Sequence, residues 1–222
     1  GANNTAIGEE ALKSNTTAAN NTAVGSDSLR TNTTGANNTV VGSCAMQSNT
    51  TGTQNVAVGR KALEANTTAG FNTAVGQSSL GANTTGTNNT AMGCGAMADN
   101  TTGEQNVAIG DTALANNTTA NLNTAVGANS MFTNTTGTNN VAVGTSALLC
   151  NTTADNNTAV GVSAMEDNTT GYSNVAIGKF AMQCNTEGFE NAVFGSAALQ
   201  KNTTGDQNTA IGSQALRCNT TA

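Results

Sequence analysis

The sequence repeats every 17 residues without an insertion or a deletion. A tag of the form [TVA]-[AV]-[VIMF]-G ends in glycine at positions 8, 25, 42, 59, 76, 93, 110, 127, 144, 161, 178, 195 and 212 of the chain. One unit reads N-[TV]-A-[VI]-G-x-x-A-[LM]-x-x-N-T-T-G-x-x. We number its positions 1 to 17, so that Asn4, Asn21 and Asn38 occupy position 1. Thirteen units in register identify a tandem-repeat protein.

The length of the unit favours β-structure. Seventeen residues are too few for a helical-hairpin repeat, which takes about 33 residues or more. Positions 1–5 instead show the alternation of a short strand, with Thr or Val at position 2 and Val or Ile at position 4. We predict an all-β fold, a parallel β-solenoid of thirteen coils over residues 1–222. At about 4.8 Å per coil, it would be roughly 60 Å long.

The terminal units resemble the middle ones. Solenoids ordinarily end in atypical repeats that cover the open ladder, whereas here the first and last units keep the common pattern. The sequence therefore predicts a solenoid without capping elements. We expect either a piece of a longer array or copies that stack end to end, and both alternatives make a fibre.

The few charged residues mark the predicted solvent side. The chain has 7 Lys or Arg and 13 Asp or Glu, and all of them fall at positions 6, 7, 10, 11, 14, 16 and 17 of the unit. Examples are Glu9, Arg30 and Asp167. Because unpaired charges are almost never buried, these positions are predicted to be exposed turns. Positions 4 and 9 hold only large apolar residues, for instance Val58 and Leu63, and are predicted to be the core.

Strand alternation extends this prediction to an interface. If positions 2 and 4 point inward, positions 1, 3 and 5 point outward. Position 1 is always Asn, position 3 is Ala or Val and position 5 is always Gly, so none of them carries a charge. We predict that they form a flat face of about 600 Å² that contacts a partner. Its residues in three units are Asn21, Ala23, Gly25, Asn89, Ala91, Gly93, Asn106, Ala108 and Gly110. The alternative is a stacked Asn amide ladder, with Gly at a tight corner.

The Asn-Thr-Thr segment at positions 12–14 is nearly invariant. Glu187 is its one exception, and a Glu at position 14 indicates that this position faces water. One interpretation is turn chemistry with Asn side chains stacked between coils. The other is N-glycosylation of an outward Asn row, because N-x-T is the acceptor motif. The candidate acceptors are Asn15, Asn32, Asn49, Asn66, Asn83, Asn100, Asn117, Asn134, Asn151, Asn168, Asn202 and Asn219. A further acceptor occurs where Asn at position 17 precedes Asn-Thr, as at Asn20.

The composition disfavours catalysis and metal binding. The chain has no His, and its carboxylates are scattered over seven positions, so we expect no catalytic residue, no metal site, no cofactor and no enzyme. Cys150, Cys184 and Cys218 share position 11, each two coils or about 9.6 Å from the next at strand spacing. Because a disulfide needs Cα atoms within roughly 7 Å, we expect no intrachain bridge. A net charge of −6 disfavours nucleic acid, and no apolar run approaches the roughly 20 residues of a membrane helix.

The repeat resembles known fibre proteins. Asn-Thr-Ala-Val-Gly-x-x-x-Leu, as at Asn21 to Leu29, resembles the head repeats of trimeric autotransporter adhesins, whose strand core reads like Ser-Val-Ala-Ile-Gly. The fuller unit with Asn-Thr-Thr-Gly is similar to repeats of phage tail-fibre and bacterial surface-fibre proteins. In the adhesins the alternating apolar residues fill a left-handed parallel β-roll, and the intervening Ala faces partner subunits. The resemblance thus implies that positions 2 and 4 point inward and that Ala of position 3 lies at an interface.

Together these features favour a structural protein. We expect the shaft of an extracellular fibre or adhesin, outside the cell or on a cell or virion surface. It would form by end-to-end and side-by-side association of its own copies as a homopolymer or trimer, with glycans along the Asn-Thr-Thr row as an open alternative. The other candidate function is ice binding through a flat Thr/Asn/Ala face. The Thr residues at positions 13 and 14 are adjacent, however, so strand geometry would leave only one outward Thr rank.

Overall fold

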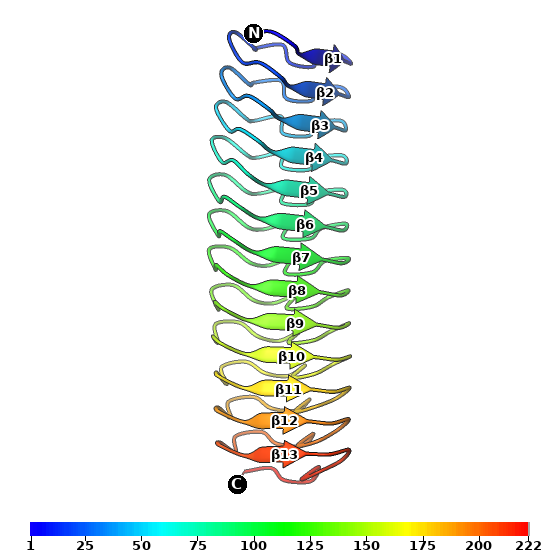
Figure 1. Cartoon of the computed structure of the whole chain (residues 1–222), viewed down its shortest axis with the longest axis vertical. Helices are drawn as coiled ribbons and strands as arrows, with labels where there is room; N and C mark the ends of the chain where they lie inside the picture. Colours follow the sequence, from blue (N-terminus) through cyan, green and yellow to red (C-terminus); the bar gives the residue numbers. More distant parts are fainter. Residues whose placement is uncertain (222) are drawn as a thin grey trace. The chain divides into compact units, whose positions relative to one another are not determined.

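A computed structural model describes residues 1–221 and contains thirteen three-residue strands (Figure 1). No helix occurs in this described part of the chain. Two compact units, Gly1–Asp111 and Thr112–Ala222, divide the chain. The first unit holds β1 (Thr5–Ile7), β2 (Thr22–Val24), β3 (Thr39–Val41), β4 (Val56–Val58), β5 (Thr73–Val75), β6 (Thr90–Met92) and β7 (Val107–Ile109). The second holds β8 (Thr124–Val126), β9 (Val141–Val143), β10 (Thr158–Val160), β11 (Val175–Ile177), β12 (Ala192–Phe194) and β13 (Thr209–Ile211).

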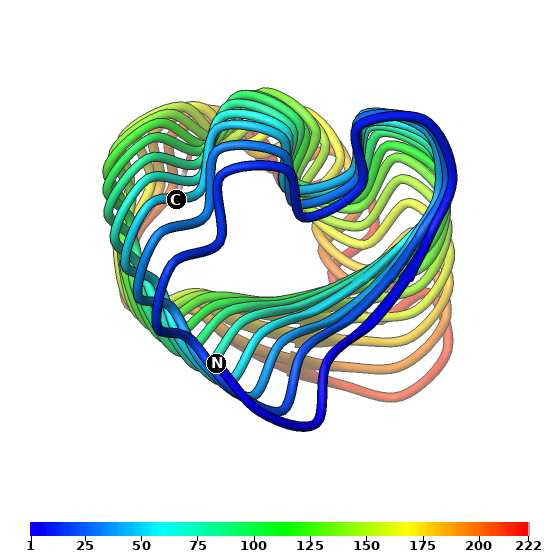
Figure 2. The ribbon, with the colours of Figure 1, turned by 90° about the horizontal axis from the view of Figure 1, so that it is seen from above.

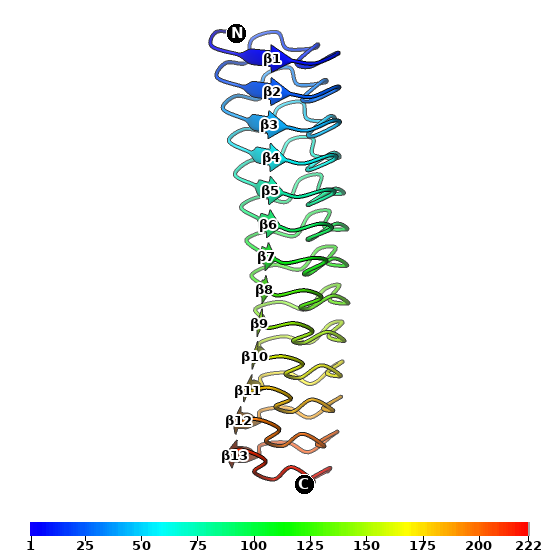
Figure 3. The same cartoon turned by 90° about the vertical axis from the view of Figure 1, so that its right-hand side faces the viewer.

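Within each unit every strand pairs in parallel with its neighbours in chain order (Figures 1 and 3). The register offsets partners by one repeat, so that Thr22 lies beside Thr39 and Ala23 beside Val40. Each repeat position therefore forms a row along the stack. The prediction of an all-β parallel β-solenoid with a 17-residue coil is confirmed, whereas a single uncapped solenoid over residues 1–222 stays a prediction.

The strand ends at the glycine of position 5. All thirteen of these glycines have φ between 119° and 147°, where side chains are strained. Successive coils also approach closely at this corner, since a Cβ on Gly59 would lie 2.5 Å from the carbonyl oxygen of Gly76. This agrees with the tight-corner interpretation of the glycine.

Three consecutive turns follow the glycine and fold the chain back. In the fourth coil the backbone N–H groups of Ala62, Glu64 and Asn66 each donate to the carbonyl three residues earlier, at 3.0–3.3 Å. Lys61 and Leu63 have φ of 62° and 52°, as the third residue of a type II turn requires. A bulky residue such as Leu63 is rare at positive φ, yet here the turn is what directs its side chain into the coil, where it is fully buried.

Each coil encloses the same small set of side chains. Seen down the stack, the coils of each unit retrace one closed path (Figure 2). The buried positions are Asn at 1, Ala or Val at 3, Ala or Ser at 8, Leu or Met at 9, Asn at 12 and Gly or Ala at 15. The core is thus partly apolar and partly built from amides, and position 9 is confirmed as core.

Candidate functional site: the outward strand face

The strands face the opposite way from the sequence prediction. In β6, Ala91 is fully buried, Met92 is 42% exposed and Thr90 is half-buried. The same order holds in the other strands, apart from the exposed β1. Positions 2 and 4 therefore point outward and position 3 points inward. The prediction that Val58 and its equivalents at position 4 are core is wrong, as is the orientation that the adhesin resemblance implied.

The predicted interface residues consequently lie inside the coils. Asn21, Ala23, Asn89, Ala91, Asn106 and Ala108 are buried, and Gly25, Gly93 and Gly110 are half-buried at the strand-end corner. The reason is space. A Leu or Met from position 9 and two Asn side chains already occupy each coil, so position 3 is Ala in eleven coils and otherwise only Val40 or Val193. The larger β-branched residues stay on the open side of the strand.

The Asn row of position 1 is an interior ladder. The amide Nδ2 of Asn38 donates to the carbonyl of Gly52 at 2.9 Å, and its Oδ1 accepts from the backbone N–H of Asn55 at 3.0 Å. The Nδ2 of Asn55 donates to the same Oδ1 at 3.1 Å. The amide-ladder interpretation of this row is confirmed, but the ladder stabilises the coils from within.

The Asn row of position 12 is a second interior ladder. Asn49 Nδ2 donates to the carbonyl of Gly52 at 3.1 Å and to Asn32 Oδ1 at 2.8 Å. Asn15 and Asn219, in the first and last coils, are half-buried. The ten other predicted acceptors are fully buried: Asn32, Asn49, Asn66, Asn83, Asn100, Asn117, Asn134, Asn151, Asn168 and Asn202. The expectation that this row faces outward is therefore wrong, whereas glycosylation of the chain stays a prediction.

The two threonines of the Asn-Thr-Thr segment have different environments. Position 13 is half-buried in the inner coils, and its hydroxyl donates to the next coil, as Thr50 Oγ1 does to the carbonyl of Thr67 at 3.0 Å. Position 14 is exposed in all thirteen coils, Glu187 included. The prediction that position 14 faces water is confirmed, and its Thr residues form an exposed row.

Positions 2 and 4 make up what we call the outward strand face. In the first unit it consists of Thr5, Ile7, Thr22, Val24, Thr39, Val41, Val56, Val58, Thr73, Val75, Thr90, Met92, Val107 and Ile109. In the second unit it consists of Thr124, Val126, Val141, Val143, Thr158, Val160, Val175, Ile177, Ala192, Phe194, Thr209 and Ile211. Every one of these side chains is exposed or half-buried, and none is charged. Sequence reasoning missed this face, although the restriction of position 3 to Ala and Val was a signal of a crowded interior.

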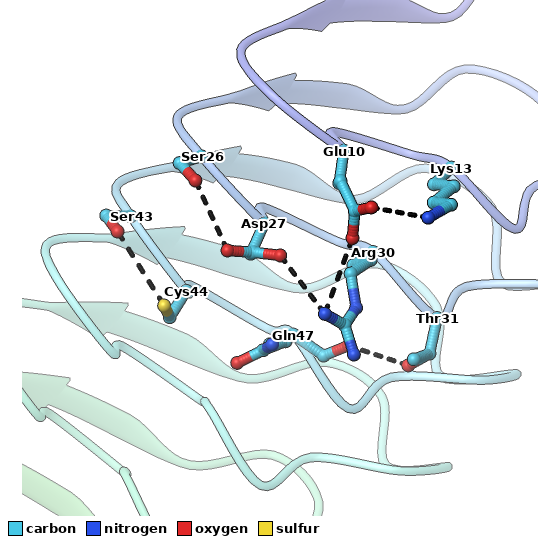
Figure 4. Close-up of polar contacts among 9 residues, drawn as sticks. All are labelled: Glu10, Lys13, Ser26, Asp27, Arg30, Thr31, Ser43, Cys44 and Gln47. Atoms are coloured by element: carbon cyan, nitrogen blue, oxygen red, sulfur yellow. Dashed lines mark hydrogen bonds and ion pairs between the residues drawn. The ribbon is translucent and has the colours of Figure 1, made fainter.

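The turn side of the first unit contrasts with this face. Glu10 contacts both Lys13 and Arg30, and Arg30 also pairs with Asp27 at 3.3 Å (Figure 4). These residues come from positions 7 and 10 of neighbouring coils. The pairs are partly exposed, so each contributes little to stability. These charges lie at partly exposed turn positions, in agreement with the prediction that the charged positions form the turns.

In part of the second unit, the corner beside the outward strand face carries large apolar side chains. Val162, at position 6, is 45% exposed. In the next coil the ammonium of Lys179 lies 4.6 Å from the ring centroid of Phe180, a cation–π contact. On another turn, Tyr172 and Phe189 stack with their centroids 4.9 Å apart.

The position-11 row of the second unit brings thiols near carboxylates. Burial, followed by the charges of Asp167 and Glu166, raises the pKa of the Cys150 thiol, and the same causes raise the pKa of Cys184. All five cysteines are free thiols. A raised pKa keeps these thiols protonated and poorly nucleophilic at neutral pH. The described residues contain no group of three or more His, Cys, Asp or Glu that could hold a metal, and they form no pocket.

The described part of the chain contains no helix long and apolar enough to cross a membrane. Among the surfaces described above, the outward strand face has the clearest chemical character, because it is regular, free of charge and partly apolar. No protein-family model and no curated protein sequence matches the chain.

Proposed function

We propose that this protein is structural, and that its copies associate side by side through the outward strand face to form the shaft of an extracellular fibre or adhesin. One observation carries the proposal: the exposed side of the strands has no charge in any of its thirteen coils. A strand face that remained in water would be expected to collect Lys, Glu or Gln over so many repeats. Apolar rows of this kind mark protein–protein contact surfaces.

A second copy of the chain is the partner that fits this face best. The rows of Thr or Val and of Val or Ile repeat at every coil, so an identical copy presents the same rows at the same spacing. Such a surface is self-complementary, as a symmetric homo-oligomer requires. The described residues form no pocket for a small ligand.

The area of the outward strand face indicates how strongly two copies of the chain should associate. From a strand spacing of about 4.8 Å and about 3.3 Å per residue, it covers roughly 300 Å² in each unit. The face of each unit is therefore smaller than the roughly 800 Å² per partner of a standard interface. We therefore expect association that depends on protein concentration.

The test is sedimentation velocity over a range of concentrations. Met92→Lys combined with Ile109→Lys places two ammonium groups on the outward strand face, where both side chains are about two-fifths exposed. We expect this variant to keep the circular dichroism of the native chain and to sediment as a monomer. Thr85→Lys with Thr102→Lys adds the same charge at exposed position 14 and should associate like the native chain. A native chain that stays monomeric at all concentrations would refute the proposal.

Electron microscopy tests the fibre part separately. Side-by-side association alone gives discrete oligomers, whereas a shaft also requires end-to-end stacking. Filaments with a layer line near the strand spacing of about 4.8 Å would support the shaft. Oligomers of uniform short length would limit the proposal to lateral association.

Ice binding is the second candidate, and the structure leaves it a different face from the one first expected. Asn and Ala of the predicted Thr/Asn/Ala face are interior. Thr nevertheless occupies eight of the thirteen position-2 sites on the outward strand face, where regular rows at strand spacing are exposed. Thermal hysteresis of the monomeric Met92→Lys/Ile109→Lys variant and of the native chain separates the functions, because ice binding requires activity in the native chain that the variant loses.

A further inference from the structure

The Asn-x-Thr motifs of this chain fall into two structural classes. Twelve have their Asn at position 12 and their final Thr at exposed position 14. Five have their Asn at position 17, before Asn-Thr, and these are Asn3, Asn20, Asn37, Asn88 and Asn156. One more, Asn116, is half-buried at position 11. In the unfolded chain a glycosylating enzyme can reach the Asn of both classes. Folding buries the Asn of the first class, whereas the Asn of position 17 stays accessible.

The amide nitrogen of a position-12 Asn has no free hydrogen in the inner coils. Asn66 is typical: its Nδ2 donates to Asn49 Oδ1 at 2.8 Å and to the carbonyl of Ala69 at 3.1 Å. Its own Oδ1 accepts from Asn83 Nδ2 at 3.2 Å. Both N–H groups and the carbonyl are thus committed inside the coil, at zero exposure.

N-glycosylation consumes that nitrogen. Nδ2 attacks the anomeric carbon of a lipid-pyrophosphate-linked oligosaccharide, the bond from that carbon to the pyrophosphate oxygen breaks, the lipid pyrophosphate leaves and the amide loses one proton. The product keeps one N–H and carries a sugar ring on the nitrogen. A ladder whose successive amides approach to 2.8 Å has no room for the ring, and losing the bond would leave buried polar groups without partners. A glycosylated Asn cannot occupy position 12.

We propose that N-glycosylation of the Asn-Thr-Thr row and folding of the solenoid exclude each other. The native chain then forms only on a route of synthesis where Asn-x-Thr is not modified before folding. Sugar on the folded chain is confined to acceptors outside the ten fully buried residues of this row, chiefly those of position 17. The motif is read from local sequence, so nothing in an unfolded chain distinguishes the interior row from an ordinary acceptor.

The position-17 acceptors meet the opposite conditions. Asn20, Asn37, Asn88 and Asn156 are exposed, with φ of 59–61° at the surface. The amide of Asn20 donates only to the neighbouring Asn37 side chain, at 3.3 Å, a contact that water can replace. Modification here removes no interior bond.

The experiment uses the full chain, produced with a secretion signal in cells that N-glycosylate. The matched variant replaces the final Thr of all twelve position-12 motifs by Ala, at Thr17, Thr34, Thr51, Thr68, Thr85, Thr102, Thr119, Thr136, Thr153, Thr170, Thr204 and Thr221. These side chains are exposed, and Glu187 shows that position 14 tolerates another residue. The variant keeps every interior Asn and loses only the acceptor motif.

We expect the secreted native chain to carry sugar on position-12 residues, to exceed the 21.9 kDa of the bare chain and to lose its soluble folded fraction. The variant should fold and carry sugar only at position 17 and at Asn116, whose motif ends at the unchanged Thr118. Blocking synthesis of the lipid-linked donor should restore folding of the native chain without any substitution, which keeps the test decisive if the variant is itself unstable. A folded native chain that carries sugar on the buried Asn residues of position 12 would overturn the proposal, whereas a folded chain whose buried row is bare would support it, because folding then preceded modification.

Discussion

The two faces of each strand are equally free of charge, but for opposite reasons. On the inward face, Asn and Ala are selected by space and by hydrogen bonding, as the fully buried Ala91 and Asn89 illustrate. On the outward face, Thr, Val and Ile are exposed, and the absence of charge there has no explanation within a single coil. The comparison teaches that the absence of charge does not by itself show which side of a strand is interior, and that residue size identifies the packed side. In our proposal the exposed side meets a second copy of the chain.

Adding a charge to each face of one strand should give the largest effect. Ala91→Lys would place an ammonium inside the coil, at a cost of about 4 kcal/mol or more, and should abolish the β-sheet circular dichroism. Met92→Lys, one residue along β6, points its charge into water and should keep the fold. A folded Ala91→Lys chain, or an unfolded Met92→Lys chain, would reverse our assignment of the faces.

Breaking the interior amide ladder should lower the free energy of unfolding by somewhat less than the Ala91→Lys substitution does. Asn83→Ala removes the Nδ2 donor to Asn66 Oδ1 and Gly86 O and the Oδ1 acceptor of Asn100 Nδ2. Unsatisfied buried groups cost about 1–3 kcal/mol each, so we expect urea unfolding to show a loss of about 3 kcal/mol. Thr85→Ala, two residues away on the exposed rank, is the control and should change stability by less than about 0.5 kcal/mol. Equal losses would mean that the ladder contributes nothing specific.

The corner glycine tests where the strand faces end. Gly59 has φ of 134° and no space for a Cβ beside the Gly76 carbonyl, so Gly59→Ala should destabilise the fold by about 2 kcal/mol. Gly95→Ala is the matched control. Gly95 has φ of 63° at position 7, where Ala197 is accepted in another coil, and its cost should be about 1 kcal/mol. Urea unfolding of both variants gives the difference, and a cost at Gly59 no larger than at Gly95 would contradict the close approach of the coils.

The smallest effect concerns a charge on the turn side. Partial burial, then the neighbouring Glu166, raises the pKa of Asp167 above 3.8. Because the folded-state pKa is the higher one, protonation stabilises the fold. That stabilisation is complete below pH 3.8 and is lost as the pH rises through the folded-state pKa.

Asp167→Asn should therefore raise the free energy of unfolding at neutral pH, by at most about 0.5 kcal/mol, and reduce its pH dependence on the acid side. Thermal unfolding between neutral and acid pH measures both. Glu187→Gln removes a charge from the exposed Thr rank and serves as the control. A destabilised Asp167→Asn chain at neutral pH would show that the carboxylate is favourable where it lies.

The sequence predicts the fold well because the period and the glycine each leave few alternatives. A 17-residue unit with one strand and a glycine corner can stack only as a parallel solenoid. The charges also identified the turns correctly. Leu63 could be assigned to the core because it shares position 9 with Met and Leu alone, although its positive φ is not predictable from a propensity scale.

The orientation of the strand could not be obtained in the same way. Alternation shows that two faces differ, and a shift by one residue exchanges them. Val58 was assigned to the core because position 4 holds only large apolar residues. The interior volume, however, depends on how far the turns push Leu63 and the Asn side chains inward. That volume is a tertiary property. For the same reason the acceptor motif at Asn49 could not be distinguished from an exposed one.

The most direct test of the outward strand face is methyl NMR with a soluble paramagnetic agent, recorded at low and high protein concentration. We predict that Ala methyl groups of position 3, such as Ala74, are unaffected at both concentrations. Val methyl groups of position 4, such as Val75, should be strongly relaxed in dilute solution and become protected as copies associate. Relaxed Ala methyl groups would contradict the fold assignment, and Val methyl groups that stay accessible at high concentration would contradict association through this face.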